Sequence, residues 1–236
     1  MANGHRIELR KVKKRFAMGQ DFFEALKGID LLVEAGEFLG LVGPSGSGKT
    51  TLLNLVGGLD EASEGEVFVD GKSLATLSED ELSDFRNDTV GFVFQTFNLL
   101  PVYTAFENVE FPLLLQPEKY GSNNKELVEE ILSKVGLGDK MHKMPNTLSG
   151  GECQRVAIAR AMVKRPTIVL ADEPTANLDS ENSHEILKIM AKLNEEFGTT
   201  FLFSTHDEKV MQYLRRIVRL TDGRITEDAP HEVEGA

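Results

Sequence analysis

A glycine-rich turn in the first quarter of the chain has the residue types needed to bind phosphate groups. It lies between an apolar run at 38–42 and a stretch with helical spacing at 51–56. Glycines let backbone N–H groups close around phosphate oxygens, and the first turn of a helix adds unpaired donors and the positive end of a dipole. We therefore expect the phosphates of a nucleotide to be bound by Gly43, Pro44, Ser45, Gly46, Ser47, Gly48, Lys49, Thr50 and Thr51.

Two side chains of this turn have separate expected roles. Lys49 can bring its charge to the β- and γ-phosphates, and the Thr50 hydroxyl is placed to bind Mg²⁺. Upstream of the turn, Phe16, Phe22 and Phe23 offer aromatic rings on which a base could stack. For any one of these rings taken singly, packing in the core is the favoured interpretation.

Three apolar runs typical of buried strands end in polar residues. Gln95 follows the run at 90–94, Asp172 and Glu173 follow 167–171, and His206 follows 200–204. Ligands of parallel sheets bind beyond the carboxyl ends of the strands, so these side chains are expected to converge there. Asp172 is suited to hold Mg²⁺, Glu173 to polarise an attacking water, His206 to contact the γ-phosphate, and Gln95 to touch water or the metal. Taken singly, His206 could be a satisfied core histidine and Gln95 a surface amide.

A second turn rich in serine and glycine opens a helix at Ser149-Gly150-Gly151. Its helix N-terminus is suited to an anion, although a plain helix cap is an equal alternative for the motif alone. The turn lies in a segment that is expected to be distant from the first phosphate site. Two copies arranged head to tail would let each turn cover the nucleotide of the other copy, with ATP between them.

The elements that must position these residues alternate between strands and helices, which predicts an α/β fold with a parallel sheet. Residues 95–165 are expected to form an inserted α-helical subdomain, and 1–94 with 166–236 the nucleotide-binding core. Capping boxes are predicted at three helix starts, and 227–236 is expected to be disordered because it is acidic. The predicted boxes pair Ser78 with Glu81, Thr104 with Glu107, and Asn123 with Glu126.

Composition excludes some classes of function. The net charge of -12 argues against a broad basic face for nucleic acid or anionic lipid. A single cysteine, Cys153, excludes an internal disulfide and fits a reducing compartment. We expect no secretory signal and no membrane span, because no apolar run reaches eighteen residues.

Together these motifs resemble the nucleotide-binding subunit of an ATP-binding cassette (ABC) transporter, from about Ile7 to Glu227. The matching segments are the phosphate loop 43–50, the glutamine loop 94–97, the signature 148–155, the second Walker motif 168–173, the D-loop 176–179 and the histidine switch 204–207. The resemblance implies a P-loop (RecA-like) parallel-sheet core with an N-terminal antiparallel β subdomain. It also implies ATP hydrolysis on Glu173 with Mg²⁺, and a homodimer formed through ATP, in which Asp179 of the D-loop is one of the residues that bind the nucleotide.

The same resemblance implies membrane-spanning permease partners that dock in a groove near Gln95, and a cytoplasmic location on the inner face of the membrane. Phe16 matches the adenine-stacking aromatic of the family. Several segments, among them 58–60 and 104–109, are similar to the lipoprotein-release and macrolide-export ATPases. Cys153, where the family usually has Gln, and Phe106, where this subgroup usually has Leu, depart from the pattern.

Three alternatives remain. A soluble ABC ATPase acting on ribosomes or nucleic acid is disfavoured by the acidic charge and by the single cassette. An ABC ATPase of the cell-division type is not excluded by any residue. A GTPase or small-molecule kinase that shares only the phosphate loop lacks support, because no guanine-reading Asn-Lys-x-Asp occurs.

Overall fold

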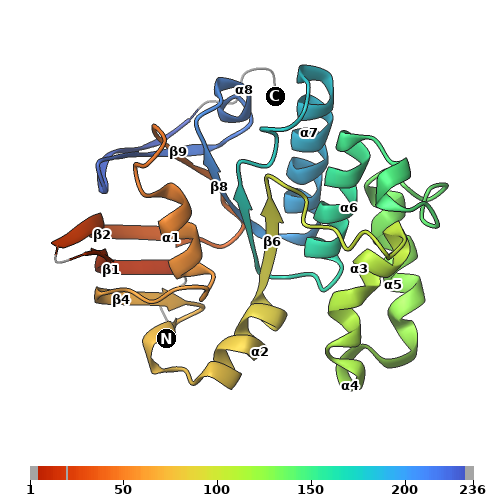
Figure 1. The fold of residues 1–236 in the computed structure, drawn as a ribbon, viewed down its shortest axis with the longest axis horizontal. Coiled ribbons are helices and arrows are strands. Elements are labelled where there is room, and N and C mark those ends of the chain that lie inside the picture. Colours follow the sequence, from red (N-terminus) through yellow and green to blue (C-terminus); the bar gives the residue numbers. More distant parts are fainter. Residues whose placement is uncertain (1–4, 20, 232–236) are drawn as a thin grey trace.

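Residues 5–19 and 21–231 are described by the computed structural model, and they form two β-sheets with helices around them (Figure 1). The larger sheet has six strands in the order β10-β9-β3-β8-β7-β6. Strands β3, β6, β7, β8 and β9 run parallel, and β10 pairs antiparallel with β9. Their bounds are β3 Phe38–Val42, β6 Val90–Phe94, β7 Ile168–Asp172, β8 Thr200–Thr205, β9 Arg216–Thr221 and β10 Arg224–Pro230.

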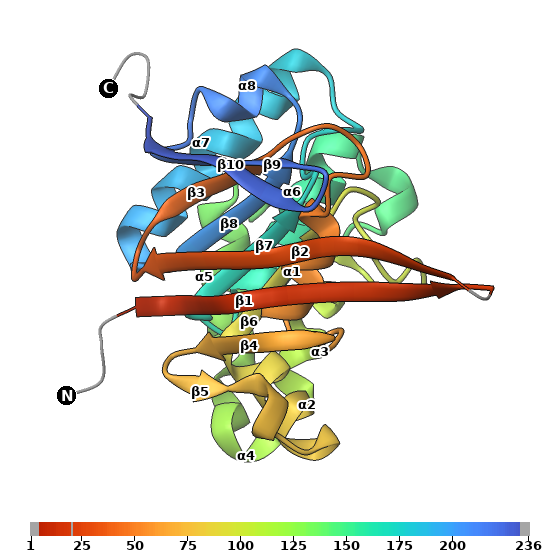
Figure 2. The same ribbon diagram turned by 90° about the vertical axis from the view of Figure 1, so that its left-hand side faces the viewer.

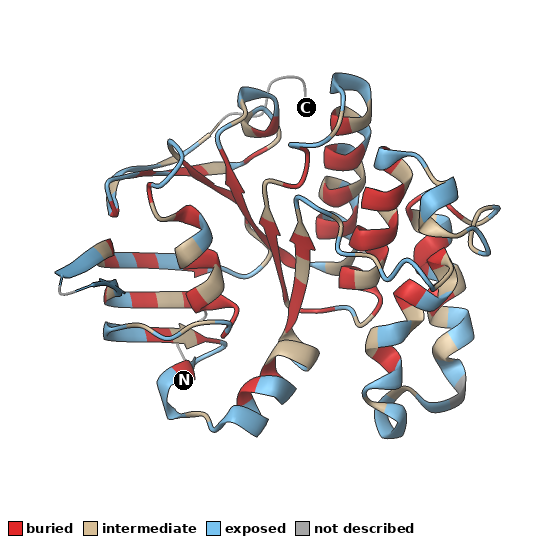
Figure 3. Ribbon diagram, viewed as in Figure 1, coloured by how far each residue is buried: buried red, intermediate tan, exposed pale blue. Residues whose placement is uncertain are grey.

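The central strands of this sheet are covered on both faces. Every residue of β3 and of β8 is buried, which explains why both read as continuous apolar or small-residue runs rather than as alternating ones (Figure 3). The parallel sheet predicted from these runs is confirmed. All the parallel strands run in one direction, so the residues that follow β6, β7 and β8 lie together at the carboxyl ends of these strands.

The smaller sheet is antiparallel, as the family resemblance implied. Its order is β2-β1-β4-β5, and Figure 2 shows β2, β1 and β4 side by side across one face of the molecule. Its strands are β1 His5–Met18, β2 Asp21–Glu34, β4 Glu64–Val69 and β5 Lys72–Ser73. Helix α1, Lys49–Val56, packs between the two sheets, where Leu52 and Leu55 join Leu26 and Leu202 in one hydrophobic cluster.

Helices cover the other side of the large sheet and enclose a second hydrophobic cluster (Figure 1). Between β6 and β7 the chain forms α3 Ala105–Leu114, α4 Pro117–Tyr120, α5 Asn124–Lys134 and α6 Gly150–Met162. Helix α6 packs against α3, α5 and α7 and against strand β6, so it connects the inserted helices to the sheet. The remaining helices are α2 Glu79–Thr89, α7 Ser180–Phe197 and α8 Glu208–Met211, and single 3₁₀ turns occur at 74–76, 121–123 and 145–147.

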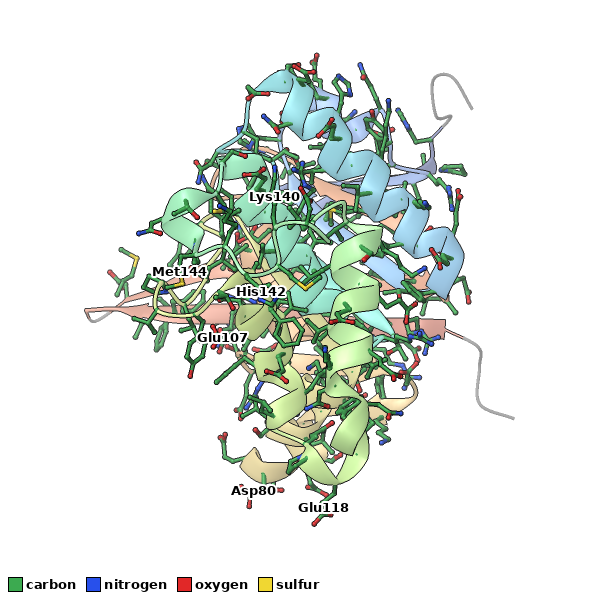
Figure 4. The ribbon with its side chains drawn as sticks, turned by 90° about the vertical axis from the view of Figure 1, so that its right-hand side faces the viewer. Asp80, Glu107, Glu118, Lys140, His142 and Met144 are labelled. Atoms are coloured by element: carbon green, nitrogen blue, oxygen red, sulfur yellow. The ribbon has the colours of Figure 1, made fainter. Side chains whose placement is uncertain are left out.

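Charged side chains lie on the outer face of the helical segment (Figure 4). Glu107, His142 and Glu118 are exposed there. Asp88 near the end of α2 accepts hydrogen bonds from Gln116 at 2.7 Å and from Lys119 at 2.7 Å. The inserted helices are therefore tied to the core by polar contacts as well as by the apolar cluster.

Two expectations from the sequence are wrong. Asn123 does not form a capping box: it ends a 3₁₀ turn with φ -91° and ψ 2°, and its side chain makes no capping bond. The acidic tail is ordered up to Pro230, because Glu227 and Asp228 pair with Arg219 and Arg216 across the β9–β10 hairpin. The rest of the predicted disordered tail, 232–236, lies outside the described residues.

Candidate functional site

The phosphate loop joins β3 to α1 and has the shape that its glycines permit. Gly46 and Gly48 have φ of 79° and 104°, in the left-handed region. A Cβ on Gly43 would lie 2.1 Å from the Leu220 carbonyl oxygen, and one on Gly48 would lie 2.8 Å from that of Ala25. Among the described residues, no side chain caps the N-terminus of α1. Its first-turn N–H groups are therefore directed at the space where a phosphate would bind.

Lys49 begins α1 and folds back over this loop. Its Nζ donates to the Gly43 carbonyl at 2.6 Å and to the Pro44 carbonyl at 3.0 Å, and the residue is buried. Burial lowers the pKa of Lys49, while the charges of Glu173 and Asp172 act in the opposite direction. The ammonium group thus lies inside the loop beside two carboxylates, where it can contact the end of a polyphosphate.

Thr50 and Asp172 come from the two elements that meet at this edge. The Thr50 hydroxyl lies 3.1 Å from Asp172 Oδ1 and 3.0 Å from Oδ2. Both side chains offer hard oxygen ligands, which are the kind that Mg²⁺ prefers. Within the described ranges no group of three or more His, Cys, Asp or Glu side chains could hold a metal ion. A Mg²⁺ ion here would therefore take its remaining ligands from phosphate and water, as is usual for this ion.

Glu173 and His206, predicted from two different strands, are brought together. His206 Nδ1 lies 2.6 Å from Glu173 Oε1, and the Thr205 hydroxyl lies 3.5 Å from Glu173 Oε2. Glu173 has φ 46°, a left-handed conformation that costs a non-glycine residue about 1–3 kcal/mol. Its backbone N–H donates to the Ser204 carbonyl at 2.9 Å, which holds the loop to β8. The carboxylate is thus fixed at the carboxyl end of β7.

Gln95 follows β6 and lies at the same edge of the sheet. Its residue is exposed, and its backbone carbonyl accepts a hydrogen bond from Asn177 Nδ2 at 2.9 Å. The structure therefore links the loop after β6 to the loop after β7 through the backbone of Gln95. A contact between its side chain and water or metal stays a prediction.

Ser149 caps the N-terminus of α6, which is the alternative to an anion site that the sequence left open. Its side chain accepts from the Glu152 N–H at 3.3 Å, and its own N–H donates to Glu152 Oε2 at 2.7 Å. Hydrogen bonds from Lys140 and then from Ser149 lower the pKa of Glu152 to about 2. The cap leaves Gly150 exposed, whereas a Cβ on Gly151 would lie 2.3 Å from Asn182 Oδ1.

The signature turn and the phosphate loop have different neighbours within one chain. Gly150 and Gly151 lie against Leu178 and Asn182, near the start of α7, whereas Gly48 lies against Ala25 of β2. Figure 1 shows α1 and α6 on opposite sides of strands β6 to β8. Asp179 was expected to bind the nucleotide in a dimer. In this chain it caps α7 by accepting a hydrogen bond from the Asn182 N–H at 2.9 Å. The hydrogen bonds from Asn182 lower the pKa of Asp179.

The aromatic residues upstream of the loop are outside the core. Phe16 is 41% exposed and Phe22 is 71% exposed, so the alternative of core packing is wrong for both. Phe16 lies directly opposite Phe23 in the β1–β2 hairpin, and Lys14 Nζ lies 5.1 Å from the centre of its ring. An aromatic surface is therefore present, and base stacking on Phe16 stays a prediction.

A groove with a volume of about 460 Å³ separates the sheet edge at β6 from the inserted helices. Phe92 and Phe94 line one wall, Phe111 and Leu115 another, and Lys164 lies within it. Lys164 Nζ donates to the backbone carbonyl of Asn87 and, at 2.8 Å, to its side-chain oxygen. Burial lowers the pKa of Lys164 to about 8.

Two buried or half-buried polar residues of α6 were missed by the sequence analysis. Gln154 donates to the Pro174 carbonyl at 2.5 Å, and Arg160 donates to the carbonyls of Phe97 and Asn98. The signal available was a long polar side chain on a helix whose neighbours are small or aliphatic, since such residues are rarely buried without a specific partner.

Comparisons with known proteins show which proteins this chain is similar to. Residues 26–176 match the family model described as ABC transporter. The chain is 46% identical over 230 residues to the lipoprotein-releasing system ATP-binding protein LolD of Anaeromyxobacter dehalogenans, covering 98% of this chain and 96% of that protein. It is 44% identical over 222 residues to the macrolide export ATP-binding/permease protein MacB of Bdellovibrio bacteriovorus, covering 94% of this chain and 34% of MacB. The chain thus spans nearly all of LolD and about a third of MacB.

The fold is similar to that of a solved ATP-binding cassette, MJ0796, whose sequence is from Methanocaldococcus jannaschii. That dimeric structure is in a post-hydrolysis state bound to ADP and Pi. The TM-score is 0.86 at 43% identity, and the match covers 95% of this chain and 98% of the other. Among the residues described in our structure, no helix has the length and apolar content needed to cross a membrane.

Proposed function

This chain belongs to the ABC transporter family, and we propose that two copies close head to tail around ATP to drive membrane-spanning partner subunits. The chain is an ABC-type ATP hydrolase. The observation that carries the proposal is the fixed carboxylate of Glu173, held by His206 at 2.6 Å beside the Thr50–Asp172 pair. That arrangement places a proton acceptor next to a phosphate loop and a magnesium site.

Each residue predicted for the site has a proposed part in nucleotide binding or hydrolysis. Lys49 and the N–H groups of residues 43–51 bind the phosphates, and Thr50 with Asp172 would hold a Mg²⁺ ion, which would supply positive charge beside them. Glu173 orients the attacking water and accepts its proton. His206 keeps Glu173 in place and contacts the γ-phosphate. Gln95 contacts the water or the metal, and Phe16 stacks on the adenine.

A second copy completes the reaction centre. Ser149, Gly150 and Asp179 lie near the start of α7 in their own chain, away from the β2 side of the phosphate loop. In a head-to-tail dimer, the α6 N-terminus of one copy offers its N–H groups and dipole to the γ-phosphate on the other. Gly151 allows the close approach of α7 that this turn requires. The dimers formed by MJ0796 support this arrangement.

The partner subunits dock in the groove beside Gln95. This groove has apolar walls from Phe111 and Leu115 and lies between the nucleotide-binding core, 1–94 with 166–236, and the inserted helices at 95–165. Similarity to LolD and MacB supports partners of the lipoprotein-release or macrolide-export type. The chain then works in the cytoplasm, bound at the inner face of the membrane through these partners.

The Glu173→Gln variant tests the function. Loss of a positioned base lowers a rate by about 10²–10⁴-fold, so the variant should release phosphate from Mg²⁺-ATP that much more slowly than the parent. It should still bind ATP and should elute as a dimer when ATP is present, because hydrolysis no longer dissolves the closed state. Glu118→Gln, at an exposed position of α4, is the matched control. Hydrolysis by Glu173→Gln at the parent rate would contradict the assignment of the base.

A further inference from the structure

Helix α6 contains a glutamine whose burial needs an explanation. Gln154 is fully buried, and its neighbours on the helix include Val156, Ala157 and Ile158. Its Nε2 donates to the Pro174 carbonyl at 2.5 Å, while its Oε1 has no partner within the described residues. An apolar side chain would fill this space without leaving a buried oxygen unsatisfied. The amide is therefore present for the bond that it makes to Pro174.

The bond falls on the residue next to Glu173. The backbone at Glu173 has φ 46°, and the following turn is closed by the Ala176 N–H, which donates to the Glu173 carbonyl at 3.2 Å. A left-handed glutamate persists only where its surroundings hold it. On one side, the Glu173 N–H is held by Ser204 of β8. On the other side, the Pro174 carbonyl is held by Gln154, so the turn is fixed at both ends.

Helix α6 is itself anchored, and this makes Gln154 a rigid support. Arg160 donates to the Phe97 carbonyl at 2.8 Å and to the Asn98 carbonyl at 2.5 Å. The loop at 95–98 is tied in turn to the loop after β7, through Asn177 and the Gln95 carbonyl. The helix, the loop after β6 and the loop after β7 thus form a closed set of polar contacts.

We propose that Gln154 is a positioning residue for ATP hydrolysis, which holds the Pro174 backbone so that the Glu173 carboxylate faces the attacking water. The inference rests on the role proposed above for Glu173. Gln154 bonds to the Pro174 backbone and is not among the residues proposed above to bind phosphate or metal. Its effect therefore belongs to the chemical step and not to nucleotide binding, since a small displacement of a catalytic group costs rate without removing binding contacts.

The test compares Gln154→Met with Gln116→Met. Methionine has nearly the volume of glutamine and lacks the donor, and Gln116 makes a similar amide bond, to Asp88, on the inserted helices. We expect kcat of Gln154→Met to fall by about 10–100-fold with KM within about 3-fold of the parent. Gln116→Met should keep the parent values. Binding of a non-hydrolysable ATP analogue and a cooperative thermal transition show that each variant is folded.

A double variant separates positioning from general damage. In the Glu173→Gln background, Gln154→Met should lower the single-turnover rate by less than about 2-fold, because the group that it positions is already gone. A fall of the same size in both backgrounds would overturn the proposal, and so would a kcat for Gln154→Met equal to that of Gln116→Met. Parent-rate hydrolysis by Glu173→Gln alone would instead contradict the proposed function. If Gln154→Met does not fold, Gln154→Asn, whose amide is one methylene too short for Pro174, takes its place with the same expected pattern.

Discussion

Thr50 and Asp172 are in hydrogen-bond contact across two elements, although 122 positions separate them in the chain. We predict that Asp172→Asn raises the Mg²⁺ concentration for half-maximal ATP hydrolysis by about 10–100-fold, the usual effect of losing a carboxylate that orients a metal's ligands. Titration of phosphate release with Mg²⁺ at fixed ATP measures this. Asp84→Asn, at an exposed position of α2, controls for the change in charge. An unchanged Mg²⁺ requirement would show that Asp172 does not serve the metal.

Lys164 should make stability depend on pH in the alkaline range. Burial is the main cause that lowers its pKa from 10.5 to about 8 in the folded chain. Between these two values the unfolded chain binds more protons than the folded chain, so the free energy of unfolding rises with pH through this window. Below about pH 8 both states hold the proton, and the cost of burying the charge is fully present.

The Lys164→Met variant isolates this effect. We predict that the parent gains stability relative to the variant as the pH rises from 7.5 to 9.5, whatever their difference at pH 7.5. Urea unfolding of both proteins at each pH measures it. A difference that does not change with pH would mean that Lys164 is not buried as the structure places it.

At the scale of single residues, the sequence predicted the residues whose type is dictated by chemistry. Lys49, Asp172, Glu173 and His206 all lie at one sheet edge, because each begins, ends or directly follows an element whose apolar run is visible in the sequence. Gln154 was not predictable in the same way. Its partner is a backbone carbonyl 20 positions away, and no side-chain pattern shows where such a carbonyl lies.

At the scale of elements, the start of α6 combines a helix cap with an ion pair. Hydrogen bonds from Lys140 and Ser149 hold the pKa of Glu152 at about 2, below its ordinary 4.5. The stabilisation is therefore fully present above about pH 4.5 and is lost as the pH falls toward 2. We predict that Glu152→Gln lowers the free energy of unfolding at pH 6, by about 1 kcal/mol for the weakened cap.

The same variant should differ less from the parent at pH 3, where the parent begins to lose this contribution. Chemical denaturation at pH 6 and pH 3 gives both values, and Glu118→Gln controls for removal of one carboxylate elsewhere. Equal deficits at the two pH values would show that the contact with Lys140 does not persist in solution.

Three capping boxes were predicted from one pattern, and two of them form. Ser78 and Thr104 have extended backbones with ψ of 167° and 170°, which turn their hydroxyls back toward the helix. Asn123 has ψ 2°, because a 3₁₀ turn runs directly into α5. The pattern of residue types was present in each case. What differs is the backbone that enters the helix, and tertiary packing sets that backbone.

At the scale of the whole molecule, the phosphate loop and the signature turn of one chain lie against different elements of the fold. The loop is enclosed by β2 and β9, whereas the turn lies against the start of α7. The division follows from the helices α3 to α6, which lie between β6 and β7 in the chain, where the sequence analysis expected an inserted helical segment at 95–165. The relative placement of the loop and the turn was beyond prediction, because it depends on packing of α6 against α3, α5 and α7.

This division predicts a specific result when two inactive chains are mixed. Lys49→Ala removes the charge of the phosphate loop, and Ser149→Phe blocks the exposed signature turn, so each variant alone should have little activity. In a mixed dimer, the phosphate loop of the Ser149→Phe chain faces the intact signature of the Lys49→Ala chain. With equal amounts and random pairing, half of the dimers are mixed and each has one intact site, which restores up to about a quarter of the parent ATPase activity.

The control for this experiment mixes Lys49→Ala with Glu173→Gln. These two residues belong to the same half of the proposed site, so every dimer, mixed or not, has a lesion in both of its sites and no activity should return. Phosphate release from the two mixtures, with mixed dimers confirmed by two different affinity tags, gives the comparison. If ATPase activity returns in the first mixture and not in the second, each reaction centre must be built from two chains. Equal activity in both mixtures would mean that one chain carries the whole reaction, and the head-to-tail dimer would then have to be abandoned.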